Sequence, residues 1–255
     1  MIDMRDQSNV RDEPAVRRFI GRTAVITGGG SGVGLAIALA LAKEGADLCL
    51  VGRRLEKLEA SAAEAQLVGA RVVCCRADLA ENTDIAELAR RLTGMEEVDI
   101  LVHSAAVLER APIELASMDD LDRHYRVNVR AAYALTQVLL PALKSRCGEV
   151  VFINSSSGMV AKPEFSQYDS TKHALRAVAD SLRAEVNSQG VRVLSIYLGR
   201  TATEMQAKLH EKESKTYKPE LLLQPGDVAS IVLNALSLPR TAEVTDIHIR
   251  PMMKT

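Results

Sequence analysis

Seven short apolar runs alternate with longer segments of helical periodicity along this chain of 255 residues, and this alternation restricts the possible folds most strongly. The runs are rich in Leu and β-branched residues without strict polar alternation, which is typical of strands covered on both faces. Strands that alternate with helices favour parallel pairing through right-handed crossovers. The predicted strands are Thr23–Thr27, Asp47–Val51, Arg71–Arg76, Asp99–His103, Glu149–Asn154, Val191–Tyr197 and Glu243–Ile249.

The order of elements predicts the α/β class: a single Rossmann-type domain with a doubly wound, parallel, seven-stranded sheet and helices on both faces. Hydrophobic residues make up 47% of the chain and aromatic residues only 3%, so the core has to be aliphatic. We expect residues 1–21 to form a polar N-terminal extension and residues 22–255 to form the domain. Ser117 and Asp120 have the spacing of a capping box that opens a long helix, and we expect Pro141 to help end it.

Net charge and cysteine content argue against several classes of protein. A net charge of −1 offers nothing to attract nucleic acid or an anionic membrane surface. The cysteines at positions 49, 74, 75 and 147 have neither a disulfide pattern nor the spacing of metal ligands. We therefore expect free thiols, a cytoplasmic protein and no metal site.

The glycine-rich segment Thr27–Gly34, TGGGSGVG, lies between the first predicted strand and the first predicted helix. Without a Cβ, the backbone of such a turn can approach a pyrophosphate, and the following helix presents free N–H groups and a favourable dipole. The spacing fits the general dinucleotide fingerprint only loosely, and a flexible turn is the alternative. The same glycines make residues 23–42, which are uncharged and nominally long enough to cross a bilayer, a poor membrane span.

The second predicted strand ends in Gly52, Arg53 and Arg54, with no carboxylate. An acidic residue at this place binds the ribose hydroxyls of NAD in many folds, whereas an arginine can pair with the 2′-phosphate of NADP. The sequence therefore favours NADP(H) over NAD(H) as the cofactor. The alternative is that both arginines are solvated residues in the first turn of the next helix.

Tyr168 and Lys172 lie four residues apart within a predicted helix, so they share one face of it. A nearby ammonium lowers the pKa of a phenol, so we expect Lys172 to lower the pKa of Tyr168 and the pair to act as a general acid–base unit. A surface tyrosine beside an unrelated lysine would have the same spacing. Ser155 favours the first interpretation, because it follows the fifth strand at the carboxyl edge of the sheet, where ligands bind.

These motifs, together with Asp78-Leu79 after the third strand and Asn128 in VNV, resemble the short-chain dehydrogenase/reductase superfamily in order and spacing. The resemblance implies that Tyr168 exchanges a proton with the substrate and that Ser155 holds the substrate oxygen. It also implies that Lys172 binds the nicotinamide ribose and lowers the pKa of Tyr168, and that Asn128 organises a water for proton relay.

The expected cofactor-binding residues lie in the turns that follow successive strands. Some come from the glycine-rich turn and the arginine pair, and the others are implied by the resemblance. They are Gly28, Ser31, Gly32, Val33, Gly34, Arg53, Arg54, Asp78, Leu79, Ser104, Ala105, Ala106, Tyr168, Lys172, Gly199, Thr201 and Thr203.

The sequence departs from the superfamily pattern at two places. HSAA at His103–Ala106 stands where the pattern has Asn-Asn-Ala-Gly, and Leu198 stands where it has Pro. Ala106 adds a Cβ near the expected cofactor, and Ser104 cannot repeat every contact of an asparagine. We expect His103 to be a structural residue at the strand end rather than a catalytic residue or metal ligand.

We expect an NADP(H)-dependent oxidoreductase that moves a hydride between nicotinamide and a small secondary alcohol or ketone. The C-terminal AEVTDIHIRPMMKT resembles 3-hydroxy acid dehydrogenases of the superfamily, so a 3-hydroxy or 3-oxo acid derivative is one candidate substrate. The alternative is a non-catalytic dinucleotide-binding protein with a regulatory or scaffold role. Residues 200–224 are expected to form a loop over the substrate. By resemblance, the helices Met118–Leu143 and Ser166–Gln189 are expected to form a homodimer or homotetramer.

Overall fold

A computed structural model describes residues 17–95 and 97–253 of the chain. All seven predicted strands are present in one parallel sheet, in the order β3-β2-β1-β4-β5-β6-β7. The predicted α/β fold is confirmed, and the strand ends differ from the prediction by at most a few residues. The strands are β1 Thr23–Thr27, β2 Asp47–Gly52, β3 Val72–Arg76, β4 Ile100–His103, β5 Glu149–Ser155, β6 Arg192–Leu198 and β7 Asp246–Ile249.

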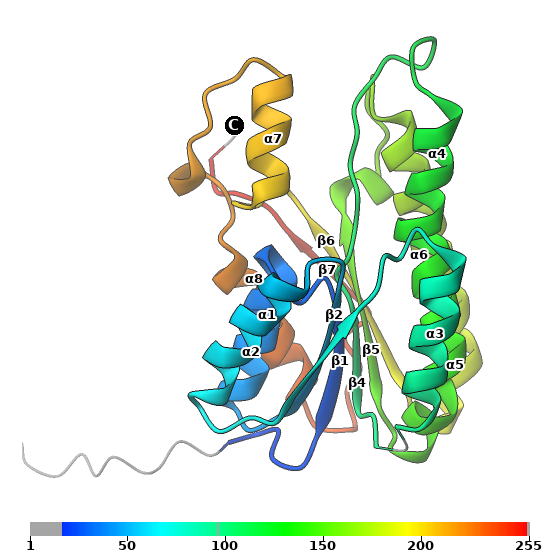
Figure 1. Cartoon of the computed structure of the whole chain (residues 1–255), viewed down its shortest axis with the longest axis vertical. Helices are drawn as coiled ribbons and strands as arrows, with labels where there is room; N and C mark the ends of the chain where they lie inside the picture. The colour runs from blue at the N-terminus through cyan, green and yellow to red at the C-terminus, as the bar shows by residue number, and fades with distance from the viewer. Residues whose placement is uncertain (1–16, 96, 254–255) are drawn as a thin grey trace, which may run out of the picture.

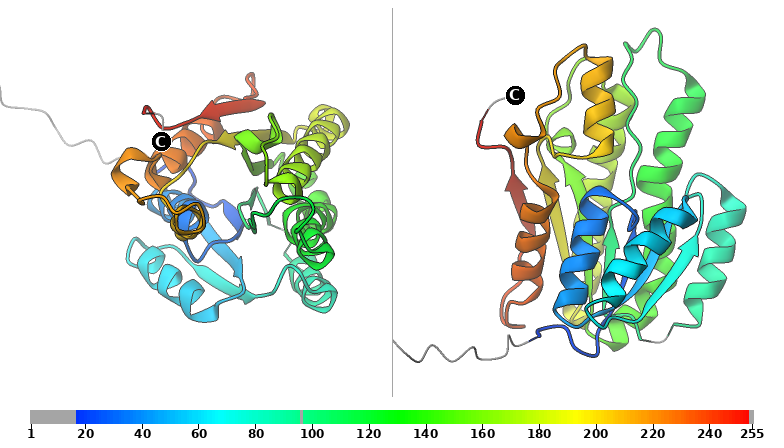
Figure 2. Two further views of the ribbon diagram at one scale, coloured as in Figure 1. Left: turned by 90° about the horizontal axis from the view of Figure 1, so that it is seen from above. Right: turned by 60° about the vertical axis from the view of Figure 1, so that its left-hand side comes forward.

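Helices cover both faces of the sheet (Figures 1 and 2). One apolar core joins the sheet to the first group of helices, α1 Gly32–Lys43, α2 Leu55–Gln66 and α8 Pro225–Leu236. A second core joins the opposite face to α3 Asn82–Thr93, α5 Ala131–Ser145 and α6 Ser166–Val186. Neighbouring strand residues such as Val25 and Ile26 belong to different cores, because successive side chains point to opposite faces of a sheet. This is why the inner strands are mostly apolar, whereas the edge strands β3 and β7 are partly exposed.

The predicted long helix from Met118 consists of α4 Met118–Tyr125, a five-residue π-helix Arg126–Arg130, and α5. The Ser117 side chain accepts a hydrogen bond from the backbone N–H of Asp120, so the predicted N-cap is confirmed. The prediction that Pro141 helps to end the helix is wrong, since α5 continues to Ser145. Proline removes one backbone hydrogen bond, but Leu139 and Leu143 on either side of it are buried in the core and hold the helix together.

The segment predicted as the substrate loop, residues 200–224, contains a helix, α7 Glu204–Lys212. Its first turn is capped by Thr203, whose Oγ1 accepts a hydrogen bond from the Gln206 N–H at 3.3 Å. Figure 1 shows α7 beyond the carboxyl ends of the strands, on the opposite side from α4. The segment over the carboxyl edge of the sheet is therefore partly helical rather than a loop throughout.

The folded domain begins before Arg22, the residue predicted as its start. Phe19 is only 1% exposed and belongs to the first core, although the sequence assigned it to the polar extension. The extension's residues 1–16 lie outside the described part of the chain. Within the described residues, no helix has the length and apolar character needed to cross a membrane.

Candidate active site

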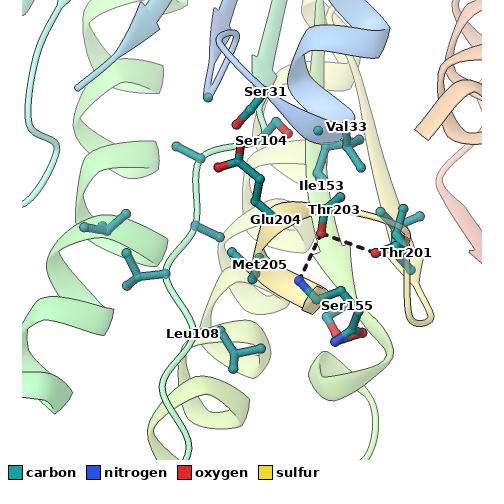
Figure 3. A pocket seen from close by; sticks show the side chains of 18 of the residues that line it. Ser31, Val33, Ser104, Leu108, Ile153, Ser155, Thr201, Thr203, Glu204 and Met205 are labelled. Atoms are coloured by element: carbon teal, nitrogen blue, oxygen red, sulfur yellow. Dashed lines mark hydrogen bonds between the residues drawn. The ribbon is translucent and has the colours of Figure 1, made fainter. Parts of the chain in front are cut away.

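A cavity of about 350 Å³ opens at the carboxyl edge of the sheet. Its walls come from the turns after β1 to β6 and from α7 (Figure 3). The sheet order reverses between β1 and β4, and the crevice at such a reversal is the usual ligand site of doubly wound folds. Every predicted cofactor-binding residue except Gly34 lines this cavity, as do Ser155, Tyr168 and Lys172.

The glycine turn has the shape that close approach of a pyrophosphate requires. Gly28 has a φ of +72°, and a Cβ there would lie 3.0 Å from the backbone nitrogen of Ala105. A Cβ on Gly34 would collide with the carbonyl oxygen of Gly28. Gly34 therefore lets α1 pack against the turn rather than lining the cavity itself. Since the N-terminus of α1 follows this turn, the residues fit the phosphates of a dinucleotide.

The turn after β4 is tied to the turn after β1. Thr27 Oγ1 accepts hydrogen bonds from the backbone N–H groups of Ser104 at 3.1 Å and Ala105 at 3.2 Å. These bonds use backbone groups, so the HSAA departure does not remove them. His103 points away from the cavity: its ring is buried, lies 2.9 Å from Thr136 Oγ1 and stacks on Phe152. Burial lowers the pKa of His103 to about 3, as expected for a neutral structural histidine.

Cations gather at the end of the cavity next to β2. Arg53 Nη1 lies 4.0 Å from Asp78 Oδ2, and the Arg53 side chain is 53% exposed. Arg54 and Lys57 both pair with Glu204, the first residue of α7, at 3.3 and 3.4 Å. The sequence shows no acid beside the arginines, but the tertiary structure brings two acids close to them from distant segments.

The predicted proton-transfer residues come together at the other end of the cavity. Tyr168 and Lys172 are both buried on α6, and Ser155 ends β5. Lys172 Nζ lies 5.6 Å from the centre of the Tyr168 ring and donates a hydrogen bond to the Ile153 carbonyl at 3.0 Å. Ser155 Oγ accepts the N–H of Ser157 at 3.1 Å, which holds the hydroxyl in the turn after β5.

Burial dominates the acid–base behaviour of this pair. Burial raises the pKa of Tyr168 to about 12, opposed by the Ser155 hydroxyl and assisted by the negative charge of Asp169. Burial also lowers the pKa of Lys172 to about 8. That Lys172 lowers the pKa of Tyr168 stays a prediction, because the causes of the shift are burial, Ser155 and Asp169, and Lys172 is not among them. The cost of burying the phenolate dominates the pKa of Tyr168, and the Lys172 ammonium donates its hydrogen bond to the Ile153 carbonyl rather than to the phenol.

Asn128 lies in the π-helix, buried behind the cavity wall rather than lining it. Its Nδ2 donates to the Val107 carbonyl and to Thr171 Oγ1, both at 3.0 Å. Its Oδ1 accepts the Val107 N–H at 2.8 Å. These contacts fasten the segment after β4 to α6, which carries Tyr168.

Several cavity residues were not predicted from the sequence. They come from the β4–α4 connection, the segment before α6, and α7, where no local motif singles them out. They include Leu108, Lys162, Phe165, Met205, Gln206 and Leu209. Among the residues that the structure describes, no group of three or more His, Cys, Asp or Glu side chains is arranged to hold a metal.

Comparison with known proteins agrees with this geometry. Residues 22–214 match the family described as short chain dehydrogenase. The chain is 33% identical over 237 residues to a glycine betaine reductase of Emericella nidulans, covering 91% of this chain but only 19% of that protein. It is 32% identical over 233 residues to an uncharacterized oxidoreductase of Staphylococcus aureus, covering 91% of this chain and 97% of that protein.

A solved structure shares the fold over nearly the whole chain. An alcohol dehydrogenase from the archaeon Thermococcus sibiricus, complexed with 5-hydroxy-NADP, has a TM-score of 0.82 and 28% identity. The match covers 92% of this chain and 98% of that one. The site geometry and the family match lead to one conclusion: the chain belongs to the short-chain dehydrogenases/reductases and is an NAD(P)-dependent oxidoreductase.

Proposed function

We propose that the protein is an NADP(H)-dependent oxidoreductase that interconverts a small secondary alcohol and its ketone. The observation that carries the proposal is one continuous cavity with the glycine turn and arginines at one end and Ser155, Tyr168 and Lys172 at the other. When bound, NADP(H) supplies or accepts the hydride at C4 of the nicotinamide. The candidate of a 3-hydroxy or 3-oxo acid derivative stays within this class.

The chain's own residues bind the substrate oxygen and move its proton. The Ser155 hydroxyl orients the oxygen, and Tyr168 gives a proton to the ketone oxygen during reduction or removes one from the alcohol during oxidation. Lys172 lies close enough to Tyr168 to hold positive charge beside the phenol and is expected to bind the nicotinamide ribose. Asn128 keeps the Val107 backbone and the Thr171 hydroxyl of α6 in place, and its proposed catalytic role is to organise a water for proton relay.

Arg53 and Arg54 support the preference for NADP(H), because their guanidinium groups line the cavity beside β2. A 2′-phosphate there would replace the weak contacts that the arginines make with Asp78 and Glu204. The structure of the similar alcohol dehydrogenase from Thermococcus sibiricus is described as a complex with 5-hydroxy-NADP, which supports this preference. We further propose a cytoplasmic protein that forms a homodimer or homotetramer and binds neither nucleic acid nor membranes.

The test is a titration with NADPH and NADH followed by an oxidation screen of secondary alcohols with NADP⁺ and NAD⁺ in parallel. NADPH is expected to bind about tenfold tighter than NADH, since hydrogen bonds to charged groups contribute roughly 1.5–3 kcal/mol. Arg53→Ala is expected to remove most of this difference while leaving NADH binding unchanged. Equal dissociation constants for the two cofactors would contradict the preference. A protein that binds cofactor but oxidises no alcohol would favour the regulatory or scaffold alternative.

A further inference from the structure

The positively charged side chains of the cavity do not all have partners. Among the described residues, six that line the cavity carry positive charge, and the carboxylates that line it are those of Asp78 and Glu204. Positive charge is therefore in excess along the walls. The cations are Arg53, Arg54, Lys57, Lys162, Lys172 and Arg200.

Five of the six have a partner. The three next to β2 pair with Asp78 and Glu204, as described above. Lys172 donates to the Ile153 carbonyl, and Arg200 forms a two-bond ion pair with Glu213 at 2.8 Å. Lys162 alone has no side-chain partner among residues 17–95 and 97–253. Lys162 is an exposed residue at the cavity wall, so its ammonium is accessible to an anionic ligand.

The backbone of Lys162 is held next to the reacting groups. Its N–H donates to Asp169 Oδ2 at 2.6 Å, and Asp169 is a buried residue in the first turn of α6, directly after Tyr168. The carbonyl of Lys162 accepts the N–H of Phe165, which also lines the cavity. The backbone of Lys162 is thus tied to the same helical turn that carries Tyr168.

A second polar group lacks a partner in this cavity. Gln206 of α7 is only 8% exposed and lines the cavity, but its side-chain amide makes no hydrogen bond with any described residue. The amide nitrogen and oxygen of Gln206 keep some contact with solvent, and a ligand oxygen in the cavity can accept a hydrogen bond from the amide N–H. Met205, the neighbour of Gln206 on α7, and Leu108 also line the cavity, and Figure 3 shows both to the left of Ser155. Apolar side chains therefore adjoin the polar ones at the substrate end.

We propose that the substrate carries an anionic group, a carboxylate or a group of similar charge, that binds the Lys162 ammonium and the Gln206 amide. The apolar side chains Leu108, Phe165 and Met205 contact the carbon skeleton between that group and the reacting alcohol. This inference rests on the proposed function, because it names the substrate class of the same site. It assigns specificity to two residues that take no part in the proton transfer.

The experiment compares secondary alcohols that carry a carboxylate at increasing distance from the carbinol with their neutral methyl esters. The proteins are the parent, Lys162→Gln, Lys162→Arg and Gln206→Met. Lys208→Gln is the matched control, because Lys208 is an exposed lysine of α7 that does not line the cavity. NADPH affinity is measured for each protein, so that a variant with a damaged cofactor site is recognised.

Lys162→Gln is expected to lower kcat/KM for the preferred carboxylate about tenfold, mainly through KM, and to leave its ester unchanged. Lys162→Arg should retain most of the activity, and Lys208→Gln should match the parent. Gln206→Met should lower kcat/KM severalfold for the carboxylate and leave that for the ester unchanged. The inference is overturned if the parent and Lys162→Gln both oxidise the carboxylate and its ester with equal kcat/KM. That result leaves the proposed function intact, because the alcohols are still oxidised. Failure of every protein to oxidise any alcohol overturns both.

Discussion

At the scale of single residues, Tyr168 acts through one hydroxyl group in the proposed mechanism. Tyr168→Phe removes that hydroxyl and almost no volume, so the fold and NADPH affinity are expected to survive. General acid–base groups contribute about a hundredfold to ten-thousandfold, and the loss should appear chiefly in kcat. Steady-state kinetics on a confirmed substrate measure it. A phenylalanine variant with parental kcat would show that Tyr168 is a packing residue.

The pH dependence of ketone reduction tests the two buried pKa values. Reduction needs the protonated forms of both residues, and burial places the pKa of Lys172 at about 8 and that of Tyr168 at about 12. Reduction is therefore expected to be fastest below pH 8 and to fall as Lys172 loses its proton. Lys172→Arg stays charged, because the arginine pKa exceeds about 12, so the fall should move to higher pH. Profiles of kcat/KM that coincide in parent and variant would contradict this assignment.

At the scale of elements, α7 is joined to both sides of the cleft. Glu204 at its start pairs with Arg54 and Lys57, and Lys212 at its end pairs with Glu109 after β4. If the 2′-phosphate of NADP(H) binds Arg54, it competes with Glu204 for the guanidinium. We therefore predict that α7 couples cofactor binding to the position of the helix over the substrate end of the cavity.

Glu204→Gln is expected to tighten NADPH binding and to leave NADH binding unchanged, since the competing carboxylate is gone. The ion pairs are half exposed, so the gain should be at most about 1 kcal/mol, or roughly fivefold in affinity. Glu211→Gln is the control, because Glu211 is exposed on the same helix and does not line the cavity. Fluorescence titration of both cofactors measures the effect. Weaker NADPH binding in Glu204→Gln would instead make Glu204 a part of the cofactor site.

At the scale of the whole molecule, apolar side chains on the long helices remain exposed. Val127, Ala131 and Leu135 are buried in the core, but Tyr125 and Tyr133 on α4 and α5 are 40% and 52% exposed. We predict that these tyrosines lie in the interface of a homodimer or homotetramer. Light scattering is expected to give a multiple of the chain mass of 27.7 kDa. Tyr133→Glu should reduce the measured mass. A parent protein that has the monomer mass at every concentration would contradict the prediction.

Local sequence patterns predicted most of the fold. Most strands were found because they are short apolar runs; the five inner strands are buried on both faces, whereas the edge strands β3 and β7 are partly exposed. The ends of β1 match the prediction. The prediction failed at Pro141, where burial of neighbouring leucines outweighs the lost hydrogen bond, and it did not foresee α7. Both errors concern segments whose conformation depends on packing against the rest of the chain.

The sequence by itself determined the parallel α/β sheet, the glycine turn before α1 and the presence of Tyr168 and Lys172 on one helical face. Periodicity and turn chemistry act between residues close together in the chain, so a sequence pattern records them. Only the tertiary structure decided that the Tyr168 pKa rises, that Glu204 meets Arg54, and that the Lys162 side chain has no partner within the described part of the chain. Burial and ion pairing depend on segments that are distant in sequence and meet only when the chain folds, because desolvation and Coulomb interactions follow distance in space.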